Sequence, residues 1–201
     1  MRSLIFLLIS AVFLTAACCG CSSIKVKRTD TSKTVDLSGG WNDSDSRMTA
    51  EEMIGDCLQR PWLSDFNIAQ GKKPVVIVGT IINRTSEHIN SGVFVNDLQR
   101  SLLNSGKVKF VSDSVSRQEL RAEKADQAQY ASKETAKPQY AETGADFMLQ
   151  GEVNSVKDEI KGKYVVLYQV NLELVNLTTN EKVWIGQKEI KKIVSRSTFG
   201  L

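Results

Sequence analysis

Residues 72–85 read KKPVVIVGTIINRT, and their unbroken apolar run from Val75 to Val78 decides the fold. A strand with one face in water alternates apolar and polar residues, whereas a continuous apolar run is typical of a strand that is covered on both faces. Further along the chain, residues 93–103 carry apolar side chains at helical spacing, and VKFV follows at residues 108–111. The three segments predict a strand, a helix and a second strand, a unit whose crossover is normally right-handed.

The second half of the chain predicts antiparallel strands. FMLQGEVNSV (147–156) has strand composition, and KYVVLYQVNLELVNL (163–177) alternates apolar residues from Val166 to Leu174 with more polar ones. That period of two indicates a half-exposed strand. TTNEK then turns the chain into KVWIGQKEIKKIV (182–194), where we expect Trp184 to be buried against the alternating face of residues 166–174. The sequence predicts an α/β (α+β) sandwich: one mixed sheet of four or five strands with packed helices, ending in an antiparallel hairpin.

Two further segments predict helices. Thr49 can cap a helix whose apolar residues recur at helical spacing and which ends near Pro61, with Glu51 and Glu52 as acids of its first turn. Residues 114–143 are charged and alanine-rich, and we expect one or two exposed helices there, broken before Pro138 and lying over one sheet face. A coiled coil is the alternative, but no heptad seam persists long enough to favour it.

The amino-terminal residues have the layout of a secretory signal. Arg2 precedes an uncharged run from residue 4 to residue 17, which is shorter than the roughly 18–20 apolar residues that span a bilayer. TAACCGCSS (15–23) follows, and it is similar to the lipobox of bacterial lipoproteins, in which small residues precede the cysteine that is lipidated. Cys18 follows LTAA and matches this pattern well; Cys21 has Gly20 before it and two serines after it. Both cysteines remain candidates for lipidation.

These features predict three regions along the chain. Residues 1–20 form the signal peptide, with its boundary at residue 17 or 20, and residues 48–201 form one globular domain. Between them, residues 21–47 are polar and rich in Ser, Thr, Asp and Lys, as in a flexible tether, with a possible short strand at Lys33–Leu37.

Composition and motifs argue against several functions. The formal charge is +3, from 26 basic and 23 acidic residues, and no stretch combines clustered basic residues with aromatics, so we expect no nucleic-acid partner. The chain contains no GxSxG, HExxH, P-loop or GxGxxG motif. The single histidine, His88, lies in the polar stretch NRTSEHINSG, which indicates a loop. We expect Cys57 to be a small, buried hydrophobic residue. The sequence therefore predicts no catalytic, metal or cofactor residues, no small-molecule substrate and no enzymatic activity. We expect the basic residues 188–196 to form the solvated end of a strand.

The order of these segments resembles the LpoB family, the outer-membrane lipoprotein activators of bifunctional penicillin-binding proteins. The resemblance covers roughly residues 48–194. It is carried by the Asn83-Arg84-Thr85 step after the first strand, the helix end LLNSGK (102–107), the strand residues Phe110-Val111 with a long helix entered at Ser114, GADFML (144–149), and the hairpin LVNLTTNEKVWIG (174–186).

The resemblance implies a function without catalysis. A protein of this kind is anchored in the outer membrane by its lipid, faces the periplasm, and binds and activates an inner-membrane peptidoglycan synthase. One departure is that known members have a long proline-rich linker, whereas the three prolines here, at positions 61, 74 and 138, all lie in the expected domain. A CsgG-like structural or secretion-associated envelope lipoprotein is the alternative, because it shares this scaffold. An envelope hydrolase is disfavoured by the missing catalytic motifs.

Overall fold

A computed structural model describes residues 26–195 of the chain. The chain divides into two compact units, Met1–Lys33 and Thr34–Leu201. The described residues of the first unit, 26–33, contain no helix or strand, so every element below belongs to the second. Within the described part of the chain, no helix is long and apolar enough to cross a membrane.

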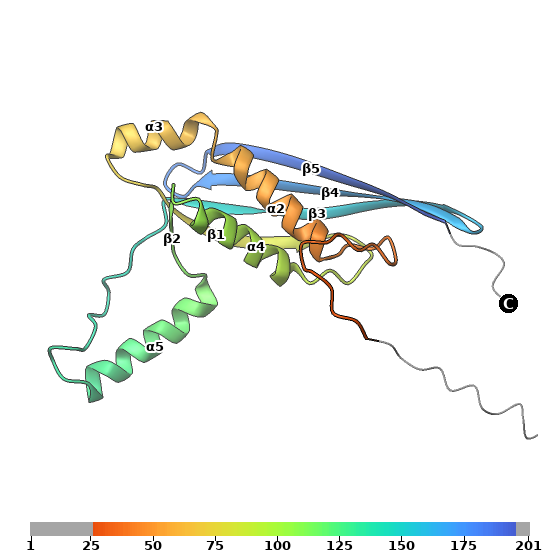
Figure 1. The fold of residues 1–201 in the computed structure, drawn as a ribbon. Coiled ribbons are helices and arrows are strands. Elements are labelled where there is room, and N and C mark those ends of the chain that lie inside the picture. Colours follow the sequence, from red (N-terminus) through yellow and green to blue (C-terminus); the bar gives the residue numbers. More distant parts are fainter. Residues whose placement is uncertain (1–25, 196–201) are drawn as a thin grey trace, which may run out of the picture. The chain divides into compact units, whose positions relative to one another are not determined.

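The second unit is built on one mixed sheet of five strands in the order β2-β1-β3-β4-β5 (Figure 1). β1 runs parallel to both of its neighbours, whereas β3, β4 and β5 pair antiparallel, so the expected mixed sheet with a terminal hairpin is confirmed. The strands are β1 (Val75–Asn83), β2 (Lys109–Phe110), β3 (Phe147–Ile160), β4 (Lys163–Asn176) and β5 (Lys182–Ser195).

Four helices accompany the sheet: α2 (Asp43–Cys57), α3 (Pro61–Gln70), α4 (Ser91–Asn104) and α5 (Ser114–Tyr130). α4 connects the parallel strands β1 and β2, as the sequence predicts. α2 and α4 contact each other and lie on the same face of the sheet (Figure 1). Their buried residues, including Ile54, Phe94 and Leu98, form one core with the inward-facing side chains of the strands.

The start of α2 corrects the sequence analysis. The helix begins at Asp43 and not at Thr49, because Asn42 and Asp45 form a reciprocal capping box at its amino terminus. Thr49 is a buried residue within the helix, and Glu51 and Glu52 lie beyond its first turn. The expected tether therefore extends too far, since residues 43–47 are helical, and residues 33–37 form no strand.

α3 was not anticipated from the sequence. Pro61 occupies the first turn of α3. The N–H groups of that turn have no partner within the helix, so proline, which lacks this group, loses no hydrogen bond there. Gly71 ends α3 in the left-handed conformation, with φ of 63°. Trp62 and Phe66 both pack edge-on against Phe147, with ring centroids 5.0 and 5.3 Å away. α3 thus extends the core over the start of β3.

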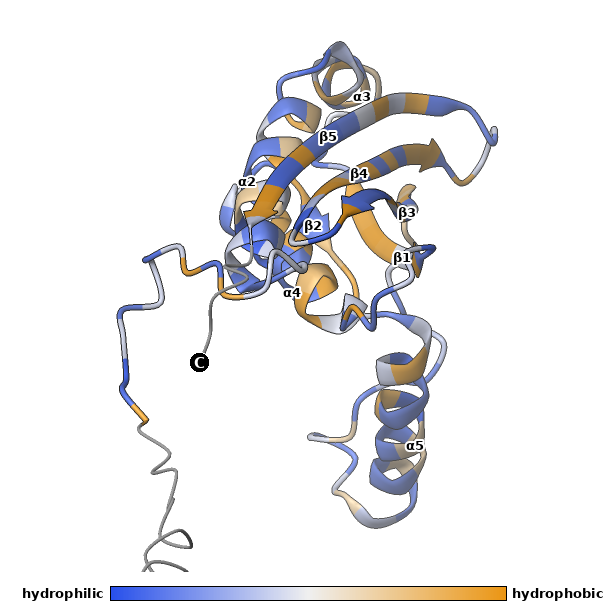
Figure 2. Cartoon of the chain, turned by 90° about the vertical axis from the view of Figure 1, so that its right-hand side faces the viewer, coloured by the Kyte–Doolittle hydropathy of each residue, from blue (hydrophilic) through white to orange (hydrophobic). Residues whose placement is uncertain are grey.

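Strand β4 follows the predicted alternation: every second residue from Val166 to Leu174 is buried, and the residues between them are partly exposed. The expected burial of Trp184 is confirmed, and it lies opposite Leu174. Its indole N–H donates to Asp56 Oδ2 over 2.8 Å, and Gly186 leaves room for the ring, because a Cβ there would lie 2.1 Å from it. Hydrophobic and hydrophilic residues also alternate along β5 (Figure 2).

Residues 114–143 differ from expectation in one respect. The chain forms a single helix there, α5, and no helix in residues 131–143. None of the residues of α5 is buried, so the expectation that it lies over a sheet face is wrong. The charged, alanine-rich sequence explains this exposure, because the helix has too few large apolar side chains to cover a sheet.

Candidate functional site: an uncovered sheet face

The face of the sheet opposite α2 and α4 is a candidate surface for binding a partner. In β3, β4 and β5 the side chains on this face are partly or fully exposed, whereas those facing the helices are largely buried near the centre of the sheet. Apolar side chains stand among polar ones here: Ile185 is 67% exposed and Ile193 is 66% exposed. We call this surface the open face.

Side-chain amides on the open face form a ladder across the strands. Gln150 Nε2 donates to Glu173 Oε1 over 2.8 Å. Gln169 and Gln187 both donate to Glu189 Oε1, each over 3.0 Å. These side chains are held in place by their neighbours before any partner arrives, which lowers the entropy that binding would cost.

Two carboxylates of the open face also pair with cations. The hydrogen bond from Asn154, followed by that from Arg84, lowers the pKa of Glu152 below its ordinary value. Lys182 Nζ lies 2.6 Å from Glu173, and this hydrogen bond, with that of Gln150, likewise lowers the pKa of Glu173. Both carboxylates are therefore ionised at neutral pH, although each is partly neutralised by its cation.

A shallow groove of about 330 Å³ crosses the open face. β1 contributes to it next to the register shift between Val78 and Ile81. Gly151 is part of its lining, and a Cβ at this position would lie 2.1 Å from the carbonyl oxygen of Asn171, so only glycine is accommodated. We call this the sheet groove; it is lined by Thr80, Ile82, Gln150, Gly151, Glu152, Asn171, Leu172, Glu173 and Ile185.

The residues that precede α2 are fastened to the end of the sheet by Lys192. Its ammonium lies 2.7 Å from Asp36 Oδ1, 2.6 Å from Asp45 Oδ2 and 3.0 Å from the Gly40 carbonyl oxygen. Its side chain is only 10% exposed, so one residue of the basic segment 188–196 is not the solvated strand end that the sequence suggests. We call Asp36, Gly40, Asp45 and Lys192 the clasp.

A second set of contacts joins the same segment to the loop after β1. Thr85 N–H donates to Asn83 Oδ1 over 2.9 Å, so the Asn83-Arg84-Thr85 step forms a tight turn. Beyond this turn, Glu87 accepts from the Tyr168 hydroxyl over 2.5 Å and from the Trp41 N–H over 3.2 Å. Burial, together with Glu87, raises the pKa of Tyr168, so its hydroxyl remains a donor at neutral pH.

The residues that sequence analysis singled out for chemistry do not come together. Cys18 and Cys21 lie outside the described residues. His88 is exposed in the loop before α4, and Cys57 is buried at the end of α2, where burial raises the pKa of its thiol to about 12. No group of three or more potential metal ligands occurs among residues 26–195. The sheet groove and the clasp were missed, although the alternation of β4 already indicated a polar outward face.

Comparison with known proteins identifies the relatives of this chain. A family described as "Peptidoglycan-synthase activator LpoB" matches residues 45–190. No curated protein matches the sequence. Among solved structures, the LpoB C-terminal domain from Salmonella enterica is 18% identical with a TM-score of 0.41, covering 73% of this chain and 98% of that one. LpoB from Escherichia coli, in an NMR structure, is 16% identical with a TM-score of 0.40, covering 88% of this chain and 83% of that one. Lipoprotein GNA1162 from Neisseria meningitidis is 14% identical with a TM-score of 0.37, covering 60% and 83%.

Proposed function

Because the chain belongs to the LpoB family of peptidoglycan-synthase activators, we propose that it binds a bifunctional penicillin-binding protein and stimulates its synthesis of peptidoglycan. The observation that carries this proposal is the family match over residues 45–190, which includes most of α2, all of α3, α4 and α5, and nearly all of the sheet. The match favours the activator over the CsgG-like alternative. It supports a regulatory role, in which the synthase supplies the catalytic groups.

We place the docking site for the synthase at the sheet groove. The opposite face is occupied by α2 and α4, whereas the groove combines ionised carboxylates, fixed amides and exposed apolar side chains. Interfaces between proteins that also exist alone have this mixed character, with apolar anchors inside a polar rim. The partner surface that complements Glu152 and Glu173 is basic with an apolar centre. Since both carboxylates already have cations beside them, we expect binding of moderate affinity and mild salt dependence.

We propose that the protein is held in the outer membrane through a lipid on Cys18 or Cys21 and that the domain faces the periplasm. Anchoring keeps the domain at a high local concentration, so that modest affinity for the synthase is enough. The clasp fixes the chain from Asp36 onward, and a tether of residues 22–35 spans about 50 Å when fully extended. This tether is shorter than the one expected from the sequence, which runs over residues 21–47.

We also propose that the protein has no catalytic activity of its own and that Cys57 and His88 are dispensable. A thiol with a pKa of about 12 is protonated at neutral pH and is a poor nucleophile. His88 is exposed and is not part of the sheet groove or the clasp.

The function is tested with a purified bifunctional synthase from the same organism. Residues 34–201, which contain all the elements of the fold, are added to the synthase, and binding and glycan-polymerisation rate are measured. We expect saturable binding and a faster rate. If the domain neither binds nor accelerates any bifunctional synthase of its organism, this proposed function is wrong.

A further inference from the structure

Helix α5 separates its charges onto two sides. Arg117, Arg121 and Lys124 follow one another at spacings of four and three residues, which places them within about 60° of each other around a helix. The acidic residues of the helix lie on the opposite side: Glu119, Glu123 and Asp126. Since no residue of α5 is buried, the core does not require this arrangement.

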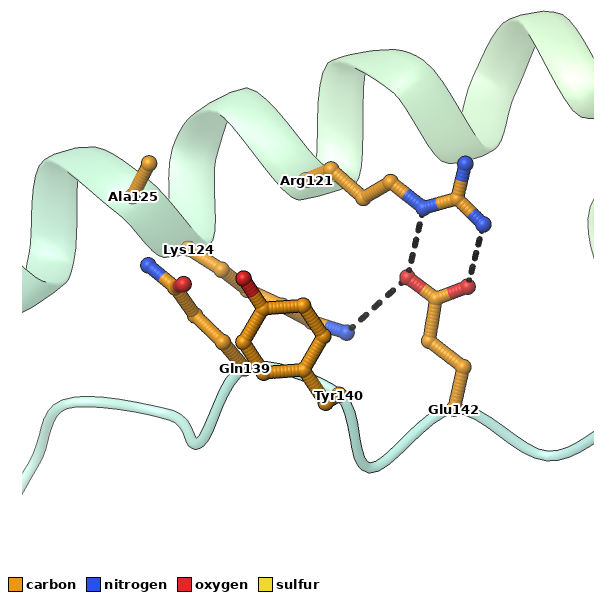
Figure 3. A pocket seen from close by; sticks show the side chains of 6 residues that line it. All are labelled: Arg121, Lys124, Ala125, Gln139, Tyr140 and Glu142. Carbon is orange, nitrogen blue, oxygen red and sulfur yellow. Dashed lines mark hydrogen bonds and ion pairs between the residues drawn. The ribbon is translucent and has the colours of Figure 1, made fainter.

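The segment that follows α5 folds back against its basic side (Figure 3). Arg121 Nε and Nη2 donate to the two oxygens of Glu142, over 3.0 and 2.8 Å, and Lys124 Nζ lies 3.7 Å from the same carboxylate. The hydrogen bond from Arg121 lowers the pKa of Glu142, which is therefore ionised at neutral pH. Arg117 adds a third positive charge, and its Nε is enclosed without a hydrogen-bond partner. One carboxylate thus faces three cations.

A pocket of about 490 Å³ lies between the helix and this segment, within the size range of small-molecule sites. Its lining is Arg121, Lys124, Ala125, Gln139, Tyr140 and Glu142. Ala125 contributes only a methyl group, and Tyr140 and Lys124 both line the pocket (Figure 3). Tyr140 is 99% exposed and has φ of 62°, a left-handed conformation that residues with a Cβ rarely adopt. Residues in sparsely populated backbone conformations cluster at active sites, ligand clamps and switch regions.

A second hollow of about 350 Å³ shares Lys124 and Glu142 with this pocket and includes Arg117 and Leu120. The excess of positive charge therefore extends along two turns of α5. An Arg or Lys side chain beside an apolar surface binds a carboxylate by charge-assisted hydrogen bonds, while an aromatic ring provides a flat contact for a ring-shaped group. The chemistry of the site matches a ligand that carries a carboxylate next to a sugar or peptide.

We call the two adjoining hollows the α5 pocket, and we propose that it binds a carboxylate-bearing glycopeptide fragment of peptidoglycan. The carboxylate lies at Lys124, which lines both hollows, and next to Arg117, which lines the second, while a sugar ring lies against Tyr140 in the first. The choice of peptidoglycan as the source rests on the proposed function, which places the domain in contact with that polymer. Such binding concentrates the activator on the peptidoglycan layer, at a site separate from the sheet groove.

The test is calorimetric titration of the mature protein, in neutral detergent, with a disaccharide tetrapeptide from peptidoglycan. We expect saturable binding that weakens as salt is raised, and weakening of about tenfold in Lys124→Ala and in Tyr140→Ala. Tyr140→Phe retains binding because it keeps the ring. Lys133→Ala is the matched control, since it removes one exposed lysine just after α5 and outside the pocket lining.

Three further arms identify the ligand. A fragment whose carboxylates are amidated should bind at least about tenfold more weakly. Vesicles of anionic phospholipid should not compete; equal binding to vesicles would overturn the proposal in favour of a phosphate-bearing lipid. Absence of fragment binding also overturns it, and loss of synthase binding in Lys124→Ala would then assign the pocket to the protein interface. The titration contains no synthase, so its outcome is separate from that of the proposed function.

Discussion

Replacing Lys192 with methionine should destabilise the domain by about 2–3 kcal/mol. Removing one partner of a fully buried ion pair costs about 3–5 kcal/mol, because it leaves the other charge buried and unpaired. The partner left behind is Asp45, whose side chain is 3% exposed. The estimate is lowered because Asp36 is half-exposed and because Asp45 also accepts the Asn42 N–H over 2.9 Å. Methionine keeps the length and most of the packing of the side chain.

The measurement is urea denaturation of the domain followed by tryptophan fluorescence. Lys191→Met is the control, because Lys191 is the adjacent residue on the exposed side of β5 and should change the unfolding free energy by less than about 0.5 kcal/mol. If Lys192→Met unfolds at the same urea concentration as this control, the clasp contributes nothing to stability and the tether extends beyond residue 35.

The effect of Lys192→Met should also depend on pH. The hydrogen bond from Lys192 lowers the pKa of Asp36, so its contribution to stability is present above the carboxyl's ordinary pKa of about 4 and is lost as the pH falls below it. Burial alone lowers the pKa of Lys192, but the hydrogen bonds to Asp36 and Asp45 outweigh it and the pKa is raised. That contribution is lost only as the pH rises past about 10.5. The difference between wild type and variant should therefore be largest near neutral pH.

Three other predictions concern the core, the anchor and the chemistry. Trp184→Ala should destabilise the domain by about 3–5 kcal/mol, and unchanged thermal unfolding would contradict the packing of β5 against α2. Mass analysis of the mature amino terminus should find an acylated cysteine at position 18 or 21; an unmodified amino terminus elsewhere refutes the anchor. Cys57→Ser and His88→Ala should keep full stimulation of the synthase, and loss of stimulation by a folded variant would require a chemical role for that residue.

Regular patterns in the sequence were enough to predict most of the sheet. The alternation from Val166 to Leu174 specifies which face of β4 is buried, and the apolar run from Val75 specifies a strand covered on both sides. The terminal hairpin and the position of Trp184 follow from the same period of two. Local periodicity is sufficient for these strands, because the alternation within each strand determines which of its own side chains face the core.

Helix boundaries were harder to predict because they depend on contacts that are distant in sequence. The segment before Thr49 is polar and reads as a tether, yet it is held by Lys192, which lies 147 residues from Asp45. The sequence predicts the end of a helix near Pro61, although proline is equally suited to the first turn of the next helix. The sheet groove could not be located from sequence, because it depends on the register between β1, β3, β4 and β5.

The account is tested most directly by comparing Ile185→Glu with Ile193→Glu in the synthase stimulation assay. Both isoleucines are about two-thirds exposed on the same side of β5, so the two substitutions should affect folding equally, but only Ile185 lines the sheet groove. We predict that Ile185→Glu weakens synthase binding at least about tenfold and lowers stimulation at limiting protein, while Ile193→Glu behaves as wild type. Full stimulation by folded Ile185→Glu protein would contradict docking at the sheet groove.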